Sequence, residues 1–153
     1  MFDSHEDPTE EVTQNPKSSR PASGRDSGSQ LDFELDFFER ILERNPDYVA
    51  VLRVHASNLT AKGLYARGLA ADRRLIRLRP NDPLSHYNLA CSYSLLHMND
   101  AAIASLDSSL KLGYRDLEHM LGDPDLAHVR KDARFVGLVG RYLLKLKKAG
   151  RTR

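Results

Sequence analysis

The chain has 153 residues, of which 41% are hydrophobic and 29% are charged, and its formal net charge is +2. This length suits one small domain with its own core, and the composition excludes a chain that is disordered throughout. The single cysteine, Cys91, cannot form an intramolecular disulfide, which favours a reducing compartment. The N-terminus lacks the basic start and apolar stretch of a signal peptide, and no run approaches membrane-spanning length. We therefore expect a cytoplasmic protein.

Residues 1–30 are rich in Ser, Pro, Gly and charged side chains and contain almost no large apolar residue. Such a segment cannot bury enough apolar surface to offset the entropy of ordering its backbone. We predict that residues 1–30 form a disordered N-terminal arm.

Helical periodicity begins at residue 31 and continues in short segments separated by turn residues. The first segment carries Leu35, Phe38 and Ile41 at helical spacing and stops at the Asn45-Pro46 pair. Four more helices are predicted, at about 51–62, 65–78, 84–96 and 100–112, with Gly63 and Gly113 placed to end two of them. No segment alternates as a strand would. The sequence predicts an all-α fold.

An internal period of 34 residues relates these helices. Aligning residues 49–82 with residues 83–116 places Ala56 over Ala90 and Gly68 over Ala102, so small residues recur where helices must approach closely. Projecting the period backwards predicts that residues 31–48 are the second helix of a unit whose first helix is absent. Stacked helical hairpins are therefore expected rather than a closed bundle.

The period and its anchor residues resemble the tetratricopeptide repeat (TPR). The unit 83–116 carries Leu89-Ala90-x2-Tyr93 and Ala102-x3-Leu106, which match the small and large positions of that pattern. The unit 49–82 diverges, because Gly68-x3-Asp72 places an acid where a large apolar residue is usual. The resemblance implies a short right-handed α-solenoid of about 2.5 units.

Residues 117–146 look like the closing segment of many bacterial TPR proteins. In that family a D-P-D-L helix precedes a D-x-R-F helix that seals the array, and residues 123–126 and 132–135 match these motifs. The residues agree with this interpretation, because Asp123 can cap a helix that starts on Pro124. An apolar stripe follows, made of Phe135, Leu138, Val139, Tyr142 and Leu146. We predict capping helices over residues 117–146.

The resemblance implies that the first helix of each unit lines a concave groove that binds a peptide or partner protein. The groove residues it implies are Arg53, Ser57, Tyr87, Asn88, Cys91 and Leu95. Asn88 matches the asparagines that hold a peptide backbone in this family, since one amide both donates and accepts; a solvated helix residue is an equal alternative. The clamp by which chaperone-type TPR domains hold a terminal carboxylate is incomplete, because Ser57 replaces an asparagine and a third unit is missing. We expect a non-catalytic adaptor.

Enzymatic and metal-binding functions lack a sequence basis. The chain has no glycine-rich phosphate loop or nucleophile elbow, and no two histidines have the i, i+4 spacing of metal ligands on one helix. Four potential metal ligands lie close in sequence, namely His119, Asp123, Asp125 and His128. Two of them have a simpler role at the start of a helix. We expect neither a cofactor nor a metal.

The C-terminus is basic and provides the alternative function. Residues 147–153 are predicted as a basic tail, and the candidate contacts to an anionic partner are Lys145, Lys147, Lys148, Arg151 and Arg153. A short disordered end with five cations could bind nucleic acid or another acidic surface. A solubilising terminus is the plainer interpretation, since no aromatic residue is interleaved to stack bases. A homodimer through the exposed half unit 31–48 is a further expectation, because half a repeat leaves apolar surface uncovered.

Overall fold

The computed structural model describes residues 27–151, and within this range the chain is helical with no strand, as the sequence predicts. The elements are α1 (Ser27–Arg44), α2 (Val49–Ala61), α3 (Tyr65–Leu78), α4 (Pro83–Leu95), α5 (Asn99–Leu112), α6 (Leu117–Gly122), the 3-10 turns η1 (Pro124–Leu126) and η2 (Val129–Lys131), and α7 (Ala133–Arg151). The predicted arm lies outside the described residues except for 27–30, which form the first turn of α1 rather than a disordered end.

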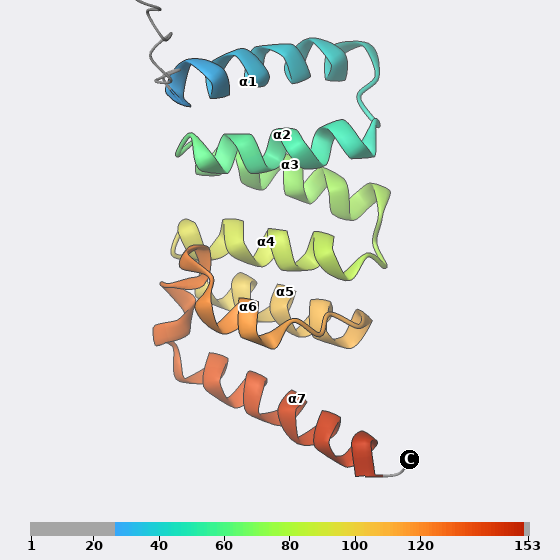
Figure 1. Ribbon diagram of the computed structural model, residues 1–153, viewed down its shortest axis with the longest axis vertical. Coiled ribbons are helices and arrows are strands. Elements are labelled where there is room, and N and C mark those ends of the chain that lie inside the picture. The colour runs from blue at the N-terminus through green and yellow to red at the C-terminus, as the bar shows by residue number, and fades with distance from the viewer. Residues whose placement is uncertain (1–26, 152–153) are drawn as a thin grey trace, which may run out of the picture.

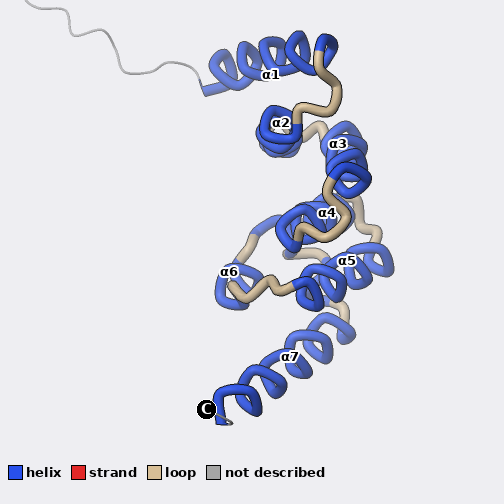
Figure 2. The backbone as a smooth tube through the Cα atoms, turned by 90° about the vertical axis from the view of Figure 1, so that its right-hand side faces the viewer, coloured by secondary structure: helices blue, strands red, loops and turns tan. Residues whose placement is uncertain are grey.

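The helices pack in chain order as an elongated stack that runs from α1 to α7 (Figure 1). Each helix from α1 to α4 contacts the next one along the chain, while η1 packs on α4, and η2 and α7 pack on α5. A view turned by 90° separates two rows, with α2 and α4 on one side, α3 and α5 on the other, and α6 beyond α4 on the outer side of the first row (Figure 2). Helix α6 therefore lies next to the outer face of the row formed by α2 and α4.

The helices recur at a step of 34 residues. Helices α2 and α4 begin and end at this separation, α3 and α5 do the same, and α1 ends one step before α3. The backbone hydrogen bonds of the connections recur as well: Leu64 N donates to Leu59 O at 2.8 Å, and Met98 N donates to Tyr93 O at 2.9 Å. The architecture is therefore repeat-like in its backbone as well as in its sequence.

The turn between the two helices of each hairpin requires a left-handed residue. Gly63 fills this place after α2 with φ 82°, and His97 fills it after α4 with φ 60°. Glycine adopts such a conformation without steric cost, whereas a side chain there is uncommon. The His97 ring stacks on His128, with ring centroids 3.9 Å apart, so the less favourable turn residue also contacts the closing segment.

Small residues allow the two helices of a hairpin to lie close together, as predicted. Ala90 and Ala102 are fully buried between α4 and α5. A Cβ atom built on Gly68 of α3 would lie 2.9 Å from Thr60 Oγ1 of α2, closer than real Cβ atoms approach. The backbone of α2 would be in ordinary contact with this Cβ, so the Thr60 side chain is the group that would have to move.

The interior consists of two apolar clusters separated by polar contacts. The first cluster joins α1, α2 and α3, and the second joins α4, α5, the closing turns and α7. Between them, Ser92 of α4 donates to Asp72 of α3, and Arg73 lies 5.5 Å from the ring centroid of Tyr93. The junction of the two units is therefore partly polar, which is unusual for a buried helix contact.

The closing segment differs in detail from its prediction. Residues 124–126 form a single 3-10 turn rather than an α-helix, because Asp123 O already accepts from Leu126 N and its carboxylate from Asp125 N. The D-x-R-F residues then open the long helix α7, where Asp132 accepts from the backbone of Arg134. The stripe of Phe135, Leu138, Val139 and Tyr142 is buried, whereas Leu146 is exposed. The stripe covers the end of the stack only as far as Tyr142.

The predicted disordered basic end is also corrected within the described range. Helix α7 continues through Lys145, Lys147 and Lys148 to Arg151. The leucines of this stretch, Leu143, Leu144 and Leu146, are exposed. The cations are therefore carried on a helix; Arg153 lies outside the described residues.

Candidate functional site

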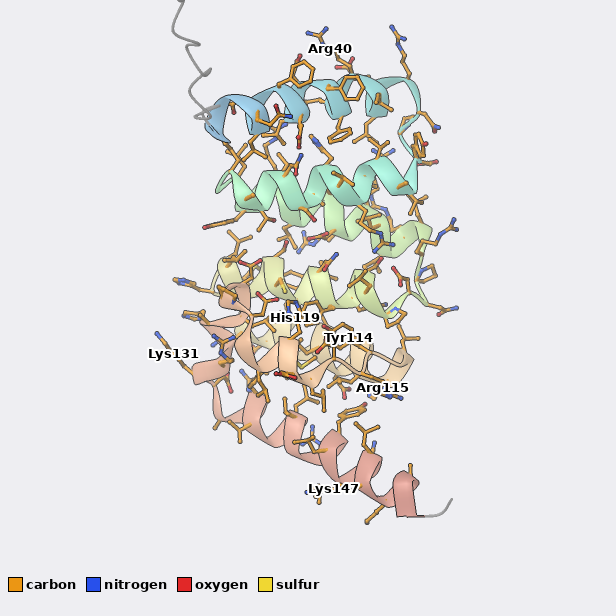
Figure 3. The ribbon with its side chains drawn as sticks, in the orientation of Figure 1. Arg40, Tyr114, Arg115, His119, Lys131 and Lys147 are labelled. Atoms are coloured by element: carbon orange, nitrogen blue, oxygen red, sulfur yellow. The ribbon has the colours of Figure 1, made fainter. Side chains whose placement is uncertain are left out.

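A hollow of about 460 Å³ opens on the face formed by α2, α4 and the segment that follows α5. Helix α2 contributes Ala56, Ser57, Thr60 and Ala61, helix α3 contributes Tyr65 and Asp72, helix α4 contributes Tyr87, Asn88, Cys91 and Ser92, and the closing segment contributes His119, Asp123 and Asp125. His119 of α6 lies beside the α4 ribbon (Figure 3). We refer to this hollow as the α2–α4 groove.

The closing side of the groove is organised around the carboxylate of Asp123. Tyr87 donates its hydroxyl to Asp123 Oδ2 at 2.6 Å, and Cys91 Sγ lies 3.8 Å from the same oxygen. His119 Nε2 is 3.3 Å from Asp123 Oδ2. The Tyr87 ring stacks on that of Tyr114 with centroids 4.5 Å apart. These contacts fix the closing segment against α4 and leave Tyr87 only 2% exposed.

Burial and charge repulsion explain why the groups around Asp123 do not ionise easily. Burial, with hydrogen bonding to Asp123 next in effect, raises the pKa of the Tyr87 hydroxyl above its usual range. Burial and the neighbouring carboxylates likewise raise the pKa of Cys91. A thiol that stays protonated is a poor nucleophile. Cys91 is therefore a packing residue of the groove.

Asp72 lies at the junction of the two units and is 3% exposed. Ser92 donates to its Oδ2 at 2.6 Å. Burial raises the pKa of Asp72 to about 6, although the Ser92 hydrogen bond and the charge of Arg53 both act in the opposite direction. At neutral pH this carboxylate is mostly ionised, and it contributes a negative charge at the bottom of the groove.

Several polar side chains of the groove form no hydrogen bond within residues 27–151, and Asn88 and Asp125 are two of them. The amide of Asn88 is half-buried and forms no side-chain hydrogen bond with this part of the chain, and the carboxylate of Asp125 forms none either. Burial and the charge of Asp123 raise the pKa of Asp125. Both side chains are available to a ligand without breaking a contact within the described chain.

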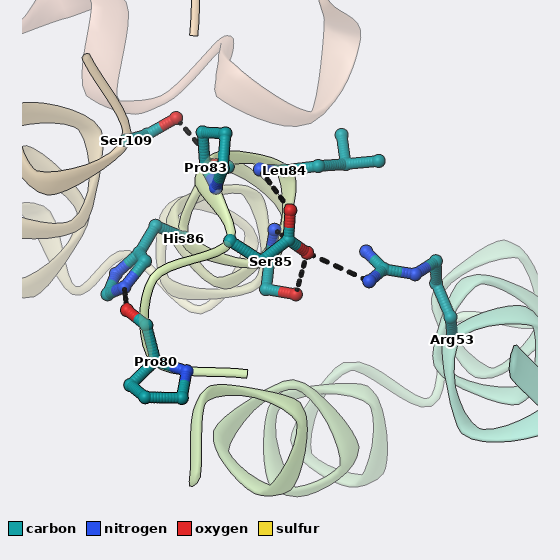
Figure 4. Close-up of polar contacts among 8 residues, drawn as sticks. Arg53, Pro80, Pro83, Leu84, Ser85, His86 and Ser109 are labelled. Carbon is teal, nitrogen blue, oxygen red and sulfur yellow. Dashed lines mark hydrogen bonds and ion pairs between the residues drawn. The ribbon is translucent and has the colours of Figure 1, made fainter. Parts of the chain in front are cut away.

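The structure brings together four of the six groove residues that the sequence predicts. Ser57, Tyr87, Asn88 and Cys91 line the groove, whereas Arg53 and Leu95 do not. Arg53 instead reaches across to the start of α4, where its Nη2 lies 2.8 Å from Asp82 Oδ2 (Figure 4). Asp82 in turn caps α4 by accepting from the backbone of Leu84 and Ser85.

The sequence analysis did not assign the acidic residues of the groove to a site. Asp72 was noted only as a departure from the repeat pattern, and Asp123 only as a helix cap and as a member of a possible metal-ligand cluster that was not favoured. Asp72 had a usable signal, because an acid at an interior position of a repeat is expected to face a polar partner. His119 and Asp125 could not be placed, since their position depends on the path of the closing segment.

The remaining candidates lie away from the groove. Lys147 is on the far end of α7 (Figure 3), and Lys145 Nζ lies 4.8 Å from the ring centroid of Tyr142. No three His, Cys, Asp or Glu side chains within residues 27–151 are arranged to hold a metal ion. None of the helices in that range combines the length and apolarity needed to cross a membrane.

Comparisons with known proteins give a partial match but no family. No family model matches the sequence, and no solved structure matches it. A stretch of 59 residues is 37% identical to part of a chloroplastic protein of Arabidopsis thaliana, and it covers 39% of this chain. The match covers 18% of that protein, so this chain spans less than a fifth of the length of the relative.

Proposed function

We propose that this chain is a non-catalytic protein-interaction module of the TPR type, which holds an extended segment of a partner protein in the α2–α4 groove. In this proposal the stack is a right-handed α-solenoid of about 2.5 units, and α6, η1, η2 and α7 close its end. The observation that carries it is the 34-residue recurrence of α2 and α4, which sets two equivalent helices side by side along the groove.

The polar chemistry of the groove supports binding of a peptide backbone. An extended segment offers alternating N–H and C=O groups. The amide of Asn88, which has no side-chain hydrogen bond within residues 27–151, can accept from one and donate to another. Ser57 is exposed on the opposite helix and adds a hydroxyl. Catalysis has less support, because Cys91 is held protonated and Tyr87 and His119 are engaged with Asp123.

A selection of peptides tests the proposal. A displayed library of random dodecapeptides would be panned on the wild-type protein, and each selected peptide would be measured against two variants. Ser57→Tyr fills the groove without changing its charge, and Asn88→Ala removes the amide. The matched control is Ala104→Tyr, at an exposed position of α5 outside the groove.

We expect a class of peptides that loses binding to Ser57→Tyr and Asn88→Ala and keeps binding to Ala104→Tyr. Melting temperatures of the variants should stay close to that of the wild type, since Ser57 and Asn88 form no side-chain hydrogen bond within residues 27–151. Selected peptides that bind all variants equally would remove the groove from the proposal.

A further inference from the structure

Within residues 27–151, the lining of the α2–α4 groove includes three acids and no lysine or arginine. Its three carboxylates come from Asp72, Asp123 and Asp125, and they approach from α3 and from the closing segment. Among the described residues, the one basic side chain of the lining is His119, whose Nε2 lies 3.3 Å from Asp123 Oδ2. Low-dielectric walls around charges of one sign concentrate their potential in the space between them.

Cations close to the groove are held by other groups. Arg53 pairs with Asp82 at the start of α4. Arg130 donates to the backbone oxygen of Asp123 rather than to its carboxylate. The negative charge of the groove is therefore only partly compensated by residues 27–151. Burial raises the pKa of Asp72, and burial together with the charge of Asp123 raises the pKa of Asp125.

Two polar groups of the groove, which form no side-chain hydrogen bond within residues 27–151, indicate where a ligand could bind. Asp125 has a carboxylate without a hydrogen-bond donor among residues 27–151, and the free amide of Asn88 lines the same hollow. If Asn88 held the backbone of a bound peptide, the side chains of that peptide would pass Asp125. A charged hydrogen bond to a carboxylate is stronger than a neutral one.

We propose that the α2–α4 groove selects partner segments that carry a lysine or arginine side chain, which enters the hollow and pairs with Asp125 beside Asp123. This inference rests on the proposed function, because it specifies the chemistry of the segment that the same groove holds. It also distinguishes this groove from a carboxylate-binding clamp: an incoming carboxylate would meet the carboxylates of Asp72, Asp123 and Asp125 and would be repelled.

The test compares the composition of the groove-dependent peptides with that of the unselected library. Groove-dependent peptides are those that Ser57→Tyr no longer binds. Their affinities would then be measured by fluorescence anisotropy for the wild type, for Asp125→Asn, and for Glu118→Gln. Glu118 is an exposed acid of α6 outside the groove, so this control removes the same charge nearby.

We expect enrichment of lysine or arginine in the groove-dependent peptides. Asp125→Asn should weaken their binding about tenfold, which corresponds to about 1.4 kcal/mol at 25 °C, and Glu118→Gln should leave it within about twofold. Replacing the enriched basic residue of a selected peptide by glutamine should cause a similar loss in the wild type and a smaller loss in Asp125→Asn.

The outcomes separate the two proposals. Groove-dependent peptides without basic enrichment, or with affinities that Asp125→Asn leaves unchanged, would overturn the charge selectivity while the groove kept its binding function. If every selected peptide bound Ser57→Tyr as well as the wild type, the groove itself would be excluded as the binding site, and both proposals would be overturned.

Discussion

Tyr87 and Asp123 lie 36 residues apart in sequence and are joined by a buried hydrogen bond of 2.6 Å. This bond ties the second unit to the segment that closes the stack, and it forms one side of the groove. The same contact therefore supports both the stability of the fold and the shape of the proposed site.

Replacing Tyr87 with phenylalanine should destabilise the protein while it preserves the ring. Asp123 Oδ2 would lose its closest donor in a buried place and keep only the longer contacts to His119 and Cys91, so we expect a loss of about 1 kcal/mol. Urea unfolding followed by circular dichroism measures this loss. Tyr48→Phe is the control, because Tyr48 is exposed and should change the free energy of unfolding very little; equal effects of the two variants would contradict the role of the Tyr87 bond.

Asp72 should make the stability of the protein fall as the pH rises from about 4 to about 6. Its folded-state pKa of about 6 exceeds the ordinary value of 3.8, so the folded chain holds this proton more tightly than the unfolded chain does. Ionisation of Asp72 therefore disfavours folding, and this effect is absent at low pH and complete above about pH 6 to 7.

Asp72→Asn isolates this effect, since an amide oxygen can still accept from Ser92. The stability of the variant relative to the wild type should increase between pH 4 and pH 7 by up to about 3 kcal/mol. Urea unfolding at several pH values measures the difference, with Glu118→Gln as the control. A difference between Asp72→Asn and the wild type that stays constant over this range would show that the carboxyl is not perturbed by folding.

Gly68→Ala should destabilise the protein even though alanine is the better helix former. The new Cβ would lie 2.9 Å from Thr60 Oγ1, and the cost of displacing the Thr60 side chain at this helix contact should exceed the propensity gain, for a net loss of about 1 kcal/mol. Gly140→Ala on α7 is the matched control, because its Cβ would meet no atom within 4 Å. Thermal melts should move in opposite directions for the two variants; a higher melting temperature for Gly68→Ala would contradict the close approach of α2 and α3.

The basic end of α7 offers a separate surface and a separate measurement. We expect the double variant Lys145→Gln/Lys147→Gln to bind groove peptides as the wild type does, because both residues lie outside the groove. Retention of the wild type on DNA at about 50 mM salt, lost at about 200 mM, would identify phosphate contacts. If the double variant abolished that retention, α7 would be the nucleic-acid or acidic-surface site of the alternative hypothesis.

A self-association test addresses the predicted homodimer. Phe33 and Phe37 are stacked and largely exposed on α1, and they form the apolar surface that a second copy would cover. Sedimentation of the wild type and of Phe37→Glu at the same concentration measures this association. We expect the variant to be more monomeric. If the wild type self-associates and the variant sediments in the same way, the contact lies elsewhere.

The sequence by itself determined the helices and their step. Turn residues such as Gly63 and Gly113, the proline at the start of α4 and the spacing of small residues act within a few positions of the chain, so local chemistry sufficed to place α3 at the predicted residues and to reveal the 34-residue period. The groove residues were implied by the resemblance to the tetratricopeptide repeat and not by the period alone, and four of the six line the groove.

Only the tertiary structure decided the charge of the groove. Asp123 and Asp125 reach it because the closing segment turns back over α4, and Arg53 is removed from it because Asp82 lies within reach. These contacts join residues 29 to 36 positions apart, and no periodic pattern of a single helix encodes them. The 34-residue step of the stack is a local property of the chain. The charge of the proposed binding surface depends instead on which side chains, distant in sequence, lie together there.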